Sequence, residues 1–107
     1  MIDEAEFRRA AEDALEALKR HLIEREDEAD AGFEVEEQNG VLQVLFEAPP
    51  GKFVITPNSA VRQIWVSALS TSFKLEWDSK GSSFVLPRTG EHMIPLMDRL
   101  LDERSEG

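Results

Sequence analysis

The sequence predicts an α+β fold, a two-layer α-β sandwich in which two terminal helices pack on one face of an antiparallel sheet of about five to six strands. Near both ends of the 107-residue chain, apolar residues recur at steps of three and four, the spacing of an amphipathic helix. Between these ends lie short segments of alternating polarity separated by turn residues, which is typical of antiparallel hairpins. A chain of this length holds one core, so we expect residues 1–107 to form a single domain.

The first helix is expected from Asp3 to about Arg25. Asp3, Glu4 and Glu6 stand in its first turn, where the helix dipole favours negative charge. The apolar residues along one face of this helix are Phe7, Ala10, Ala11, Ala14, Leu15, Leu18 and Leu22.

The strands are expected between residues 33 and 86. Gln38-Asn39-Gly40 is a strong hairpin signal between the first two strands. Further turns are expected at residues 48–51, 57–59, 70–72 and 78–81, where Pro, Gly, Asn and Ser gather. The segments of strand-like alternation are residues 33–36, 42–46, 53–55, 62–67, 73–77 and 84–86.

Helical spacing returns from about Glu91 to Glu103. Its apolar residues are Met93, Ile94, Leu96, Met97, Leu100 and Leu101. Pro95 is tolerated only in the first turn of a helix, where its missing N–H has no intrahelical partner. The second helix is therefore expected to begin between Thr89 and His92.

Composition excludes several classes of function. The chain has no Cys, which excludes disulfides, thiolate metal sites and cysteine nucleophiles. It has no apolar run long enough to span a membrane, and its acidic beginning argues against a signal or transit peptide. We therefore expect a cytoplasmic protein without a membrane partner. No phosphate loop, dinucleotide fingerprint or serine-hydrolase elbow is present, so we expect a non-enzymatic protein.

The negative charge is regional. Of the formal net charge of −10, residues 1–37 supply −9, from fourteen acids and five bases. Residues 24–37 alone contain eight carboxylates. Such crowding disfavours the compact state and repels nucleic acid, so it indicates a site for cations or for a basic protein surface. A solvated face with no ligand is the alternative.

The acidic segment does not match an EF-hand loop. With Gly32 at the turn position, two of the first three ligand positions are occupied by Ala29 and Ala31, and Gln38 replaces the final Glu. His21 and His92 are far apart in the sequence and are interpreted as surface or capping residues. An open, carboxylate-only surface would hold hard cations such as Fe²⁺, Fe³⁺, Mn²⁺ or Ca²⁺ weakly.

Alternation places Gln63, Trp65 and Ser67 on one face of their strand and Ile64 and Val66 on the other. If the helices cover only the second face, Trp65 lies outside the core. It then either packs under a loop or against a neighbouring aromatic residue, or it anchors a protein partner. We favour the anchor, because Trp is enriched at binding hot spots and the strand offers no other large residue on that side. Trp77 alternates with Phe73 and Leu75 and is expected in the core.

With these residues assembled, the chain resembles the bacterial frataxin family of the CyaY type over nearly its full length. The most specific element is Gln63-Ile64-Trp65-Val66-Ser67. The supporting elements, in chain order, are the opening E-F of the first helix, the acidic ridge, N-G-V-L, V-I-T-P-N, E-W before a polar turn, and T-G-E ahead of a final L-M helix. Lys19-Arg20-His21 departs from the family pattern, in which acids often begin the ridge.

The resemblance implies an iron-binding regulator of iron–sulfur cluster assembly that holds iron weakly, binds the cysteine desulfurase and the scaffold protein, and modulates sulfur transfer. Iron donor and iron sensor are both proposed roles for the family. Gln63, Trp65, Ser67, Glu26 and Glu28 are expected to bind the partner. We expect a monomer, with metal-induced oligomers as an alternative. An acidic protein-binding module without physiological metal and an iron-oxidising protein are competing hypotheses. The acidic ridge, the expected metal site, comprises Glu24, Glu26, Asp27, Glu28, Asp30, Glu34 and Glu36.

Overall fold

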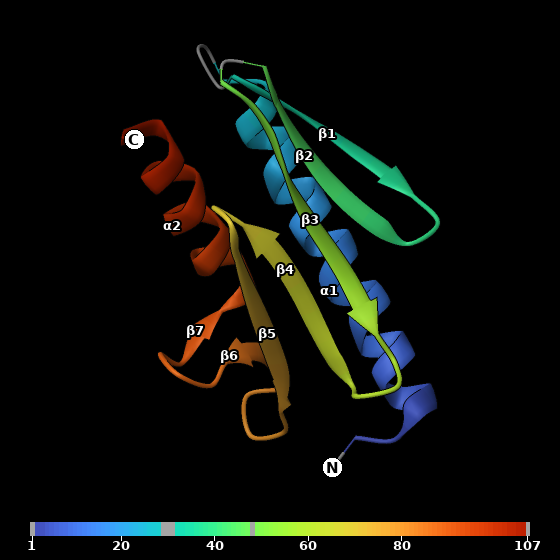
Figure 1. The fold of residues 1–107 in the computed structure, drawn as a ribbon. Helices are drawn as coiled ribbons and strands as arrows, with labels where there is room; N and C mark the ends of the chain where they lie inside the picture. Colours follow the sequence, from blue (N-terminus) through green and yellow to red (C-terminus); the bar gives the residue numbers. More distant parts are fainter. Residues whose placement is uncertain (1, 29–31, 48, 107) are drawn as a thin grey trace.

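The computed structural model describes residues 2–28, 32–47 and 49–106. It contains two helices and one antiparallel sheet in which every strand pairs with its neighbours in the sequence, in the order β1 to β7 (Figure 1). The elements are α1 (Glu4–Glu26), β1 (Phe33–Gln38), β2 (Val41–Glu47), β3 (Pro50–Asn58), β4 (Gln63–Ala68), β5 (Thr71–Asp78), β6 (Ser83–Leu86), β7 (Glu91–His92) and α2 (Met93–Glu106).

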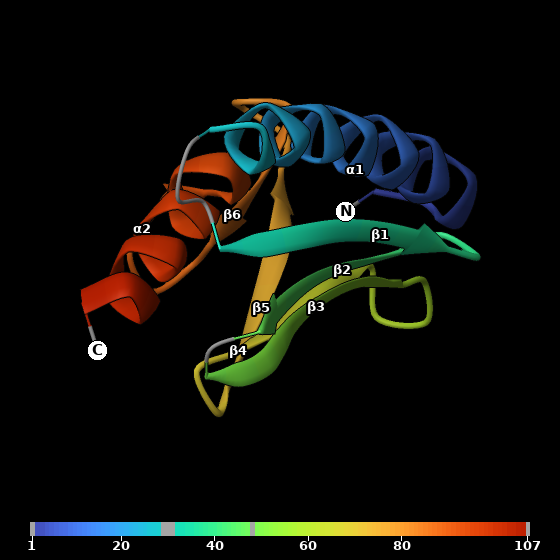
Figure 2. The ribbon, with the colours of Figure 1, turned by 90° about the horizontal axis from the view of Figure 1, so that it is seen from above.

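Both helices pack on the same side of the curved sheet, and the other side carries no helix (Figure 2). We call the uncovered side the open face. The predicted two-layer α-β sandwich is therefore confirmed. The sheet has seven strands, more than the five to six expected, because the two-residue strand β7 is too short to show any alternation in the sequence.

The core lies between the helices and the sheet. Phe7, Leu18 and Leu22 of α1 are fully buried against side chains of the central strands, and Leu96, Met97 and Leu100 of α2 complete the layer. No polar or charged residue among the described residues is buried. The hydrophobic effect over this apolar layer therefore holds the two layers together.

Turn chemistry sets the strand register. Asn39 and Gly40 both have positive φ, of 54° and 81°, as the tightest hairpin turn requires. The β4–β5 turn uses the same left-handed region at Leu69 (φ 53°) and Ser70 (φ 61°), which are uncommon there. The sequence therefore predicts the β1–β2 turn clearly and the β4–β5 turn only weakly.

The helix boundaries follow local chemistry. Asp3 is the N-cap of α1 and accepts a hydrogen bond from the backbone N–H of Glu6 at 2.8 Å. α2 begins at Met93, slightly later than expected, because Glu91 and His92 pair with β6 as β7. Pro95 is the third residue of α2, so its missing N–H falls in the first turn. Among the described residues, no helix is long and apolar enough to cross a membrane.

Candidate metal and partner-binding site

The predicted ridge begins in the last turn of α1. Glu24, Asp27 and Glu28 are exposed, whereas Glu26 is half-buried. α1 ends at Glu26, and Asp27 is its C-cap. Asp30 lies outside the described residues.

Glu26 is held by the edge of the sheet. Its Oε1 accepts a hydrogen bond from the backbone N–H of Val35 at 3.0 Å. β1 is an edge strand of the sheet, and edge strands expose unpaired backbone groups. One of these groups is satisfied by Glu26, so this carboxylate has a structural role and only part of its capacity is available to a cation.

Glu24 and Glu28 face a different direction. Together with His21 and Arg25 of α1, and with Asp98 and Asp102 of α2, they line a shallow hollow between the two helices. The hollow is thus lined by four carboxylates and one guanidinium. The ridge predicted from the sequence is consequently divided, with Glu26 directed to β1 and the pair Glu24 and Glu28 lying on the side of α2.

Arg25 neutralises part of this acidic hollow. Its guanidinium donates to Asp98 Oδ1 at 2.9 Å and lies 3.6 Å from Asp102 and 4.0 Å from Glu28. Burial lowers the pKa of Arg25, but the hydrogen bond to Asp98 and the surrounding carboxylates outweigh burial, so the pKa is raised above its ordinary value. His21 Nε2 also contacts Asp98 Oδ1 at 2.8 Å. Asp98 therefore joins both side chains of α1 to α2.

The departure from the family pattern at Lys19 has a structural counterpart. Lys19 Nζ lies 2.9 Å from Glu37 Oε1 on β1. The hydrogen bond to Glu37 and its charge raise the pKa of Lys19. The positive charge of Lys19 thus lies between α1 and β1, the two elements that Glu26 also joins.

Within residues 2–28, 32–47 and 49–106, no three Asp, Glu or His side chains converge in a geometry that would hold a metal ion. The described carboxylates of the ridge are spread over three directions rather than gathered around one point. Their oxygens suit hard cations, but without an enclosing set of ligands each cation would meet one or two carboxylates and keep most of its water. This donor set fits only weak binding of iron.

Glu34 and Glu36 lie on the open face of the sheet. Phe33 and Val35 point toward the core layer, so the alternating carboxylates point away from it. A row of directly paired residues crosses four strands on this face. Glu36 of β1 pairs with Gln43 of β2, and Gln43 pairs with Val54 of β3. Val54 in turn pairs with Ser67 of β4. Directly paired residues share a face, so Glu34 and Glu36 lie on the same side of the sheet as Ser67.

Trp65 is half-buried on this open face, where alternation with Ser67 places it. Its indole Nε1–H donates to Gln63 Oε1 at 2.8 Å, and Lys74 Nζ lies 5.0 Å from the ring centroid. The Gln63 amide in turn donates to Glu76 Oε2 at 3.3 Å. These contacts hold the indole in place while its ring remains accessible, as suits an anchor for a partner.

Trp77 faces the helix side of the sheet and packs against the core. Its ring meets the buried Phe84 ring edge-on, with centroids 5.1 Å apart. Its side chain is half-buried rather than fully enclosed. Trp77 therefore points toward the core, as expected, but it lies at the margin of the core and not inside it.

Sequence reasoning missed Asp98 and Asp102 as neighbours of the ridge. They stand four residues apart on the polar side of α2, a spacing that places both on one helix face. That signal was available, but nothing in the sequence shows that α2 lies beside the end of α1. The contacts of Lys74 and Glu76 with the Trp65 group likewise depend on the β4–β5 register.

Comparisons with known proteins agree with this architecture. A family model described as a frataxin-like domain matches residues 1–107. The chain is 26% identical over 93 residues to the iron-sulfur cluster assembly protein CyaY of Pseudomonas entomophila, covering 87% of this chain and 84% of that protein. The corresponding protein of Azotobacter vinelandii is 24% identical over 103 residues, with 96% and 89% covered.

A solved structure of frataxin from Psychromonas ingrahamii has a similar fold. Its TM-score is 0.73 at 16% sequence identity, with 98% of this chain and 93% of that chain covered. At this identity the likeness concerns the fold alone.

Proposed function

Because this chain belongs to the frataxin-like family, we propose that it acts in iron–sulfur cluster assembly as a non-enzymatic, iron-binding regulator that docks on the cysteine desulfurase complex. The related CyaY proteins are named for iron–sulfur cluster assembly. Iron is the cargo or the signal in this proposal, held weakly by surface carboxylates. The partners are the desulfurase and the scaffold protein.

One observation supports the proposal above all. Glu34 and Glu36 share the open face of the sheet with Gln63, Trp65 and Ser67, through the register of four consecutive strands. At about 4.8 Å between neighbouring strands, Glu36 and Ser67 are roughly 14 Å apart. A single basic partner surface can therefore contact the carboxylates of β1 and the indole of β4 together. The carboxylates would attract the partner by charge, and the indole would make a contact from which water is excluded.

A second candidate function is an acidic protein-binding module that holds no metal physiologically. Glu26 is already bonded to Val35, and Glu28 lies within 4.0 Å of Arg25. The bond to Val35 occupies part of the Glu26 carboxylate but leaves its negative charge, so it reduces the capacity of the ridge to coordinate cations more than its attraction for a basic surface.

The deciding experiment measures binding of the purified desulfurase by calorimetry, with and without Fe²⁺ under anaerobic conditions. Under the first function, we expect iron to change the affinity for the desulfurase, because the metal and the partner meet overlapping carboxylates. Under the second, affinity would be the same with and without iron. No binding to the desulfurase under either condition would refute both.

A further inference from the structure

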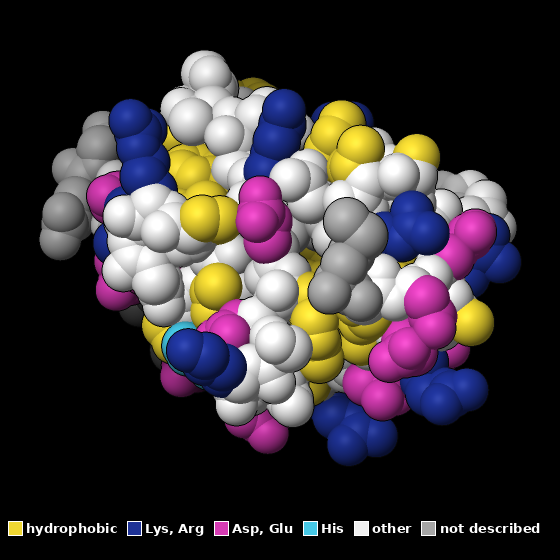
Figure 3. Space-filling view, turned by 90° about the horizontal axis from the view of Figure 1, so that it is seen from below, with side chains coloured by type: hydrophobic (Ala, Val, Ile, Leu, Met, Phe, Trp, Pro, Cys, Tyr) yellow, Lys and Arg dark blue, Asp and Glu magenta, His cyan; other side chains and the backbone are white. Residues whose placement is uncertain are grey.

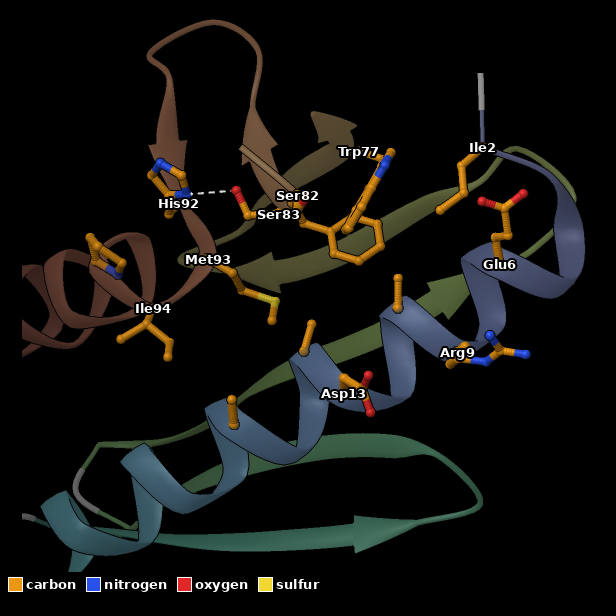
Figure 4. Close-up of a pocket in the computed structure, with 15 residues that line it drawn as sticks. Ile2, Glu6, Arg9, Asp13, Trp77, Ser82, Ser83, His92, Met93 and Ile94 are labelled. Carbon is orange, nitrogen blue, oxygen red and sulfur yellow. Dashed lines mark hydrogen bonds between the residues drawn. The ribbon is translucent and has the colours of Figure 1, made fainter. Parts of the chain in front are cut away.

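A groove on the helix side of the molecule is separate from the ridge and from the open face. It lies between α1 and the segment from β6 to the start of α2, and it encloses about 680 Å³, within the usual range of small-molecule sites. Figure 4 shows the groove with Trp77 and Met93 on one side and α1 on the other. Hydrophobic side chains are also visible between charged ones when the molecule is viewed from the N-terminal end of α1 (Figure 3).

The floor of the groove is apolar and partly aromatic. Phe84 and Met93 are buried, whereas Trp77 and Ile94 are half-buried and so still expose apolar surface. On α1, the lining residues Ala10, Ala14 and Ala17 recur at steps of four and three, which keeps this wall shallow. The space that larger side chains would fill is thus left open beside an indole ring.

Two carboxylates line the groove, those of Glu6 and Asp13, and Asp13 extends away from Trp77 (Figure 4). Glu6 lies on the Trp77 side of α1 beside Ile2, whereas Arg9 extends away from Trp77 (Figure 4). The hydrogen bond with Asp3 and the charge of that second carboxylate raise the pKa of Glu6. Two acids therefore stand together at the end of the groove, in a chain whose net charge is −10. Such a field attracts organic cations and repels organic anions.

We propose that this groove binds an amphiphilic organic cation, an aromatic or alkyl amine whose apolar part packs on the exposed surface of Trp77 and whose ammonium group meets the Glu6 carboxylate. Aromatic faces and a carboxylate are the groups that recognise such a ligand, the first through cation–π and apolar contact and the second through a charged hydrogen bond. This site is independent of the iron–sulfur role.

The test uses three probes of similar shape and different charge: 1-naphthylmethylamine, 1-naphthalenemethanol and 1-naphthaleneacetate. The chain has two Trp residues, so a ¹H–¹⁵N spectrum of the full chain contains two indole signals. Trp65 lies on the opposite face of the sheet and serves as an internal control. Trp77→Phe assigns the signals.

We expect the amine to shift the Trp77 signal saturably, with an affinity about fivefold higher than that of the neutral alcohol, and the acetate to bind most weakly. Glu6→Gln should remove the preference for the amine. Glu12→Gln, which changes an exposed carboxylate of α1 outside the groove, should leave the preference intact. Ala14→Leu, checked by melting to be folded, should weaken binding of the amine and the alcohol alike by filling the groove.

Three outcomes would overturn the proposal. They are the absence of a saturable Trp77 shift at millimolar probe, equal affinity for the three probes, and a larger shift of the Trp65 signal than of the Trp77 signal. Loss of desulfurase binding without loss of probe binding would bear only on the proposed function, so the two proposals fail separately.

Discussion

The Glu26 carboxylate accepts a hydrogen bond from the backbone N–H of Val35 at 3.0 Å and so ties the last turn of α1 to the edge strand β1. Glu26, which the sequence assigns to the acidic ridge, therefore also makes a structural contact. Its neighbours Glu24 and Asp27 are exposed. Variants of the ridge therefore need to be separated into those that alter folding and those that alter only charge.

We expect Glu26→Ala to lower the free energy of unfolding by about 1 to 2 kcal/mol, because it leaves the Val35 N–H without its charged acceptor. Glu24→Ala, the matched control, should change this free energy by less than about 0.5 kcal/mol, as is usual for exposed sites. Urea denaturation measures both. Equal effects of the two substitutions would show that the Glu26 contact contributes nothing to stability.

The two Trp residues should separate binding from stability. Trp65→Ala should weaken desulfurase binding by about 2 kcal/mol with little dependence on salt, and should cost about 1 kcal/mol of stability. Trp77→Ala should cost more stability, about 2 to 3 kcal/mol, because Trp77 packs on the buried Phe84. Paired melting and binding curves test this. If Trp65→Ala unfolds the domain as severely as Trp77→Ala, Trp65 is no partner anchor.

Iron should bind weakly and mainly at the ridge. In an NMR titration with Fe²⁺, we expect broadening to concentrate on residues 24–28 and 33–37, because the exposed carboxylates there are open to a hard cation. The exposed His92, which contacts Ser83 at 2.9 Å, is the control. Broadening centred on His92 would place the metal at an imidazole nitrogen away from the ridge and contradict the prediction.

Reversing charge on the open face should weaken desulfurase binding in a salt-dependent way. The double variant Glu34→Lys/Glu36→Lys should lose most affinity at low ionic strength, and the loss should shrink as the screening length falls toward about 8 Å. Glu12→Lys/Asp13→Lys makes the same change of net charge on α1, away from the open face. A similar loss in both variants would mean that only net charge matters to the partner.

Acid should loosen the junction of β7 and α2. Arg99 donates two hydrogen bonds to Glu91, at 2.7 and 2.9 Å. These bonds lower the pKa of Glu91 below its ordinary value of 4.5. The stabilisation is therefore fully present above that value and is lost as pH falls through the lower pKa of the folded state. Glu91→Gln should reduce stability at neutral pH by up to about 1 kcal/mol and flatten this part of the acid titration. An unchanged pH profile in Glu91→Gln would exclude the pair as its cause.

Local signals explain which parts of the fold are predictable from the sequence. Asn39-Gly40 defines its turn because few residues accept positive φ, and alternation places Trp65 outside the core because only one face of the sheet is covered. Strand β7 escaped detection because two residues carry no periodicity. Leu69 and Ser70 adopt positive φ, which neither residue favours, because the pairing of β4 with β5 requires a tight turn there.

The candidate site is less predictable because it depends on distances between elements. The sequence shows a run of acids, but the direction of each side chain depends on helix phase and on packing. Glu26 turns toward β1, whereas Glu24 and Glu28 join Asp98 and Asp102. Contacts between residues more than 70 positions apart, such as His21 with Asp98, leave no trace in a local pattern.

The contacts of His21 and Arg25 with Asp98 have a consequence for biosynthesis. α1 leaves the ribosome before any strand, and every strand then finds its partner in the segment made just before or after it. The charged side chains near the end of α1 meet Asp98 only after the whole sheet has emerged. A nascent chain can therefore complete its hairpins while the acidic end of α1 still lacks this bond to α2.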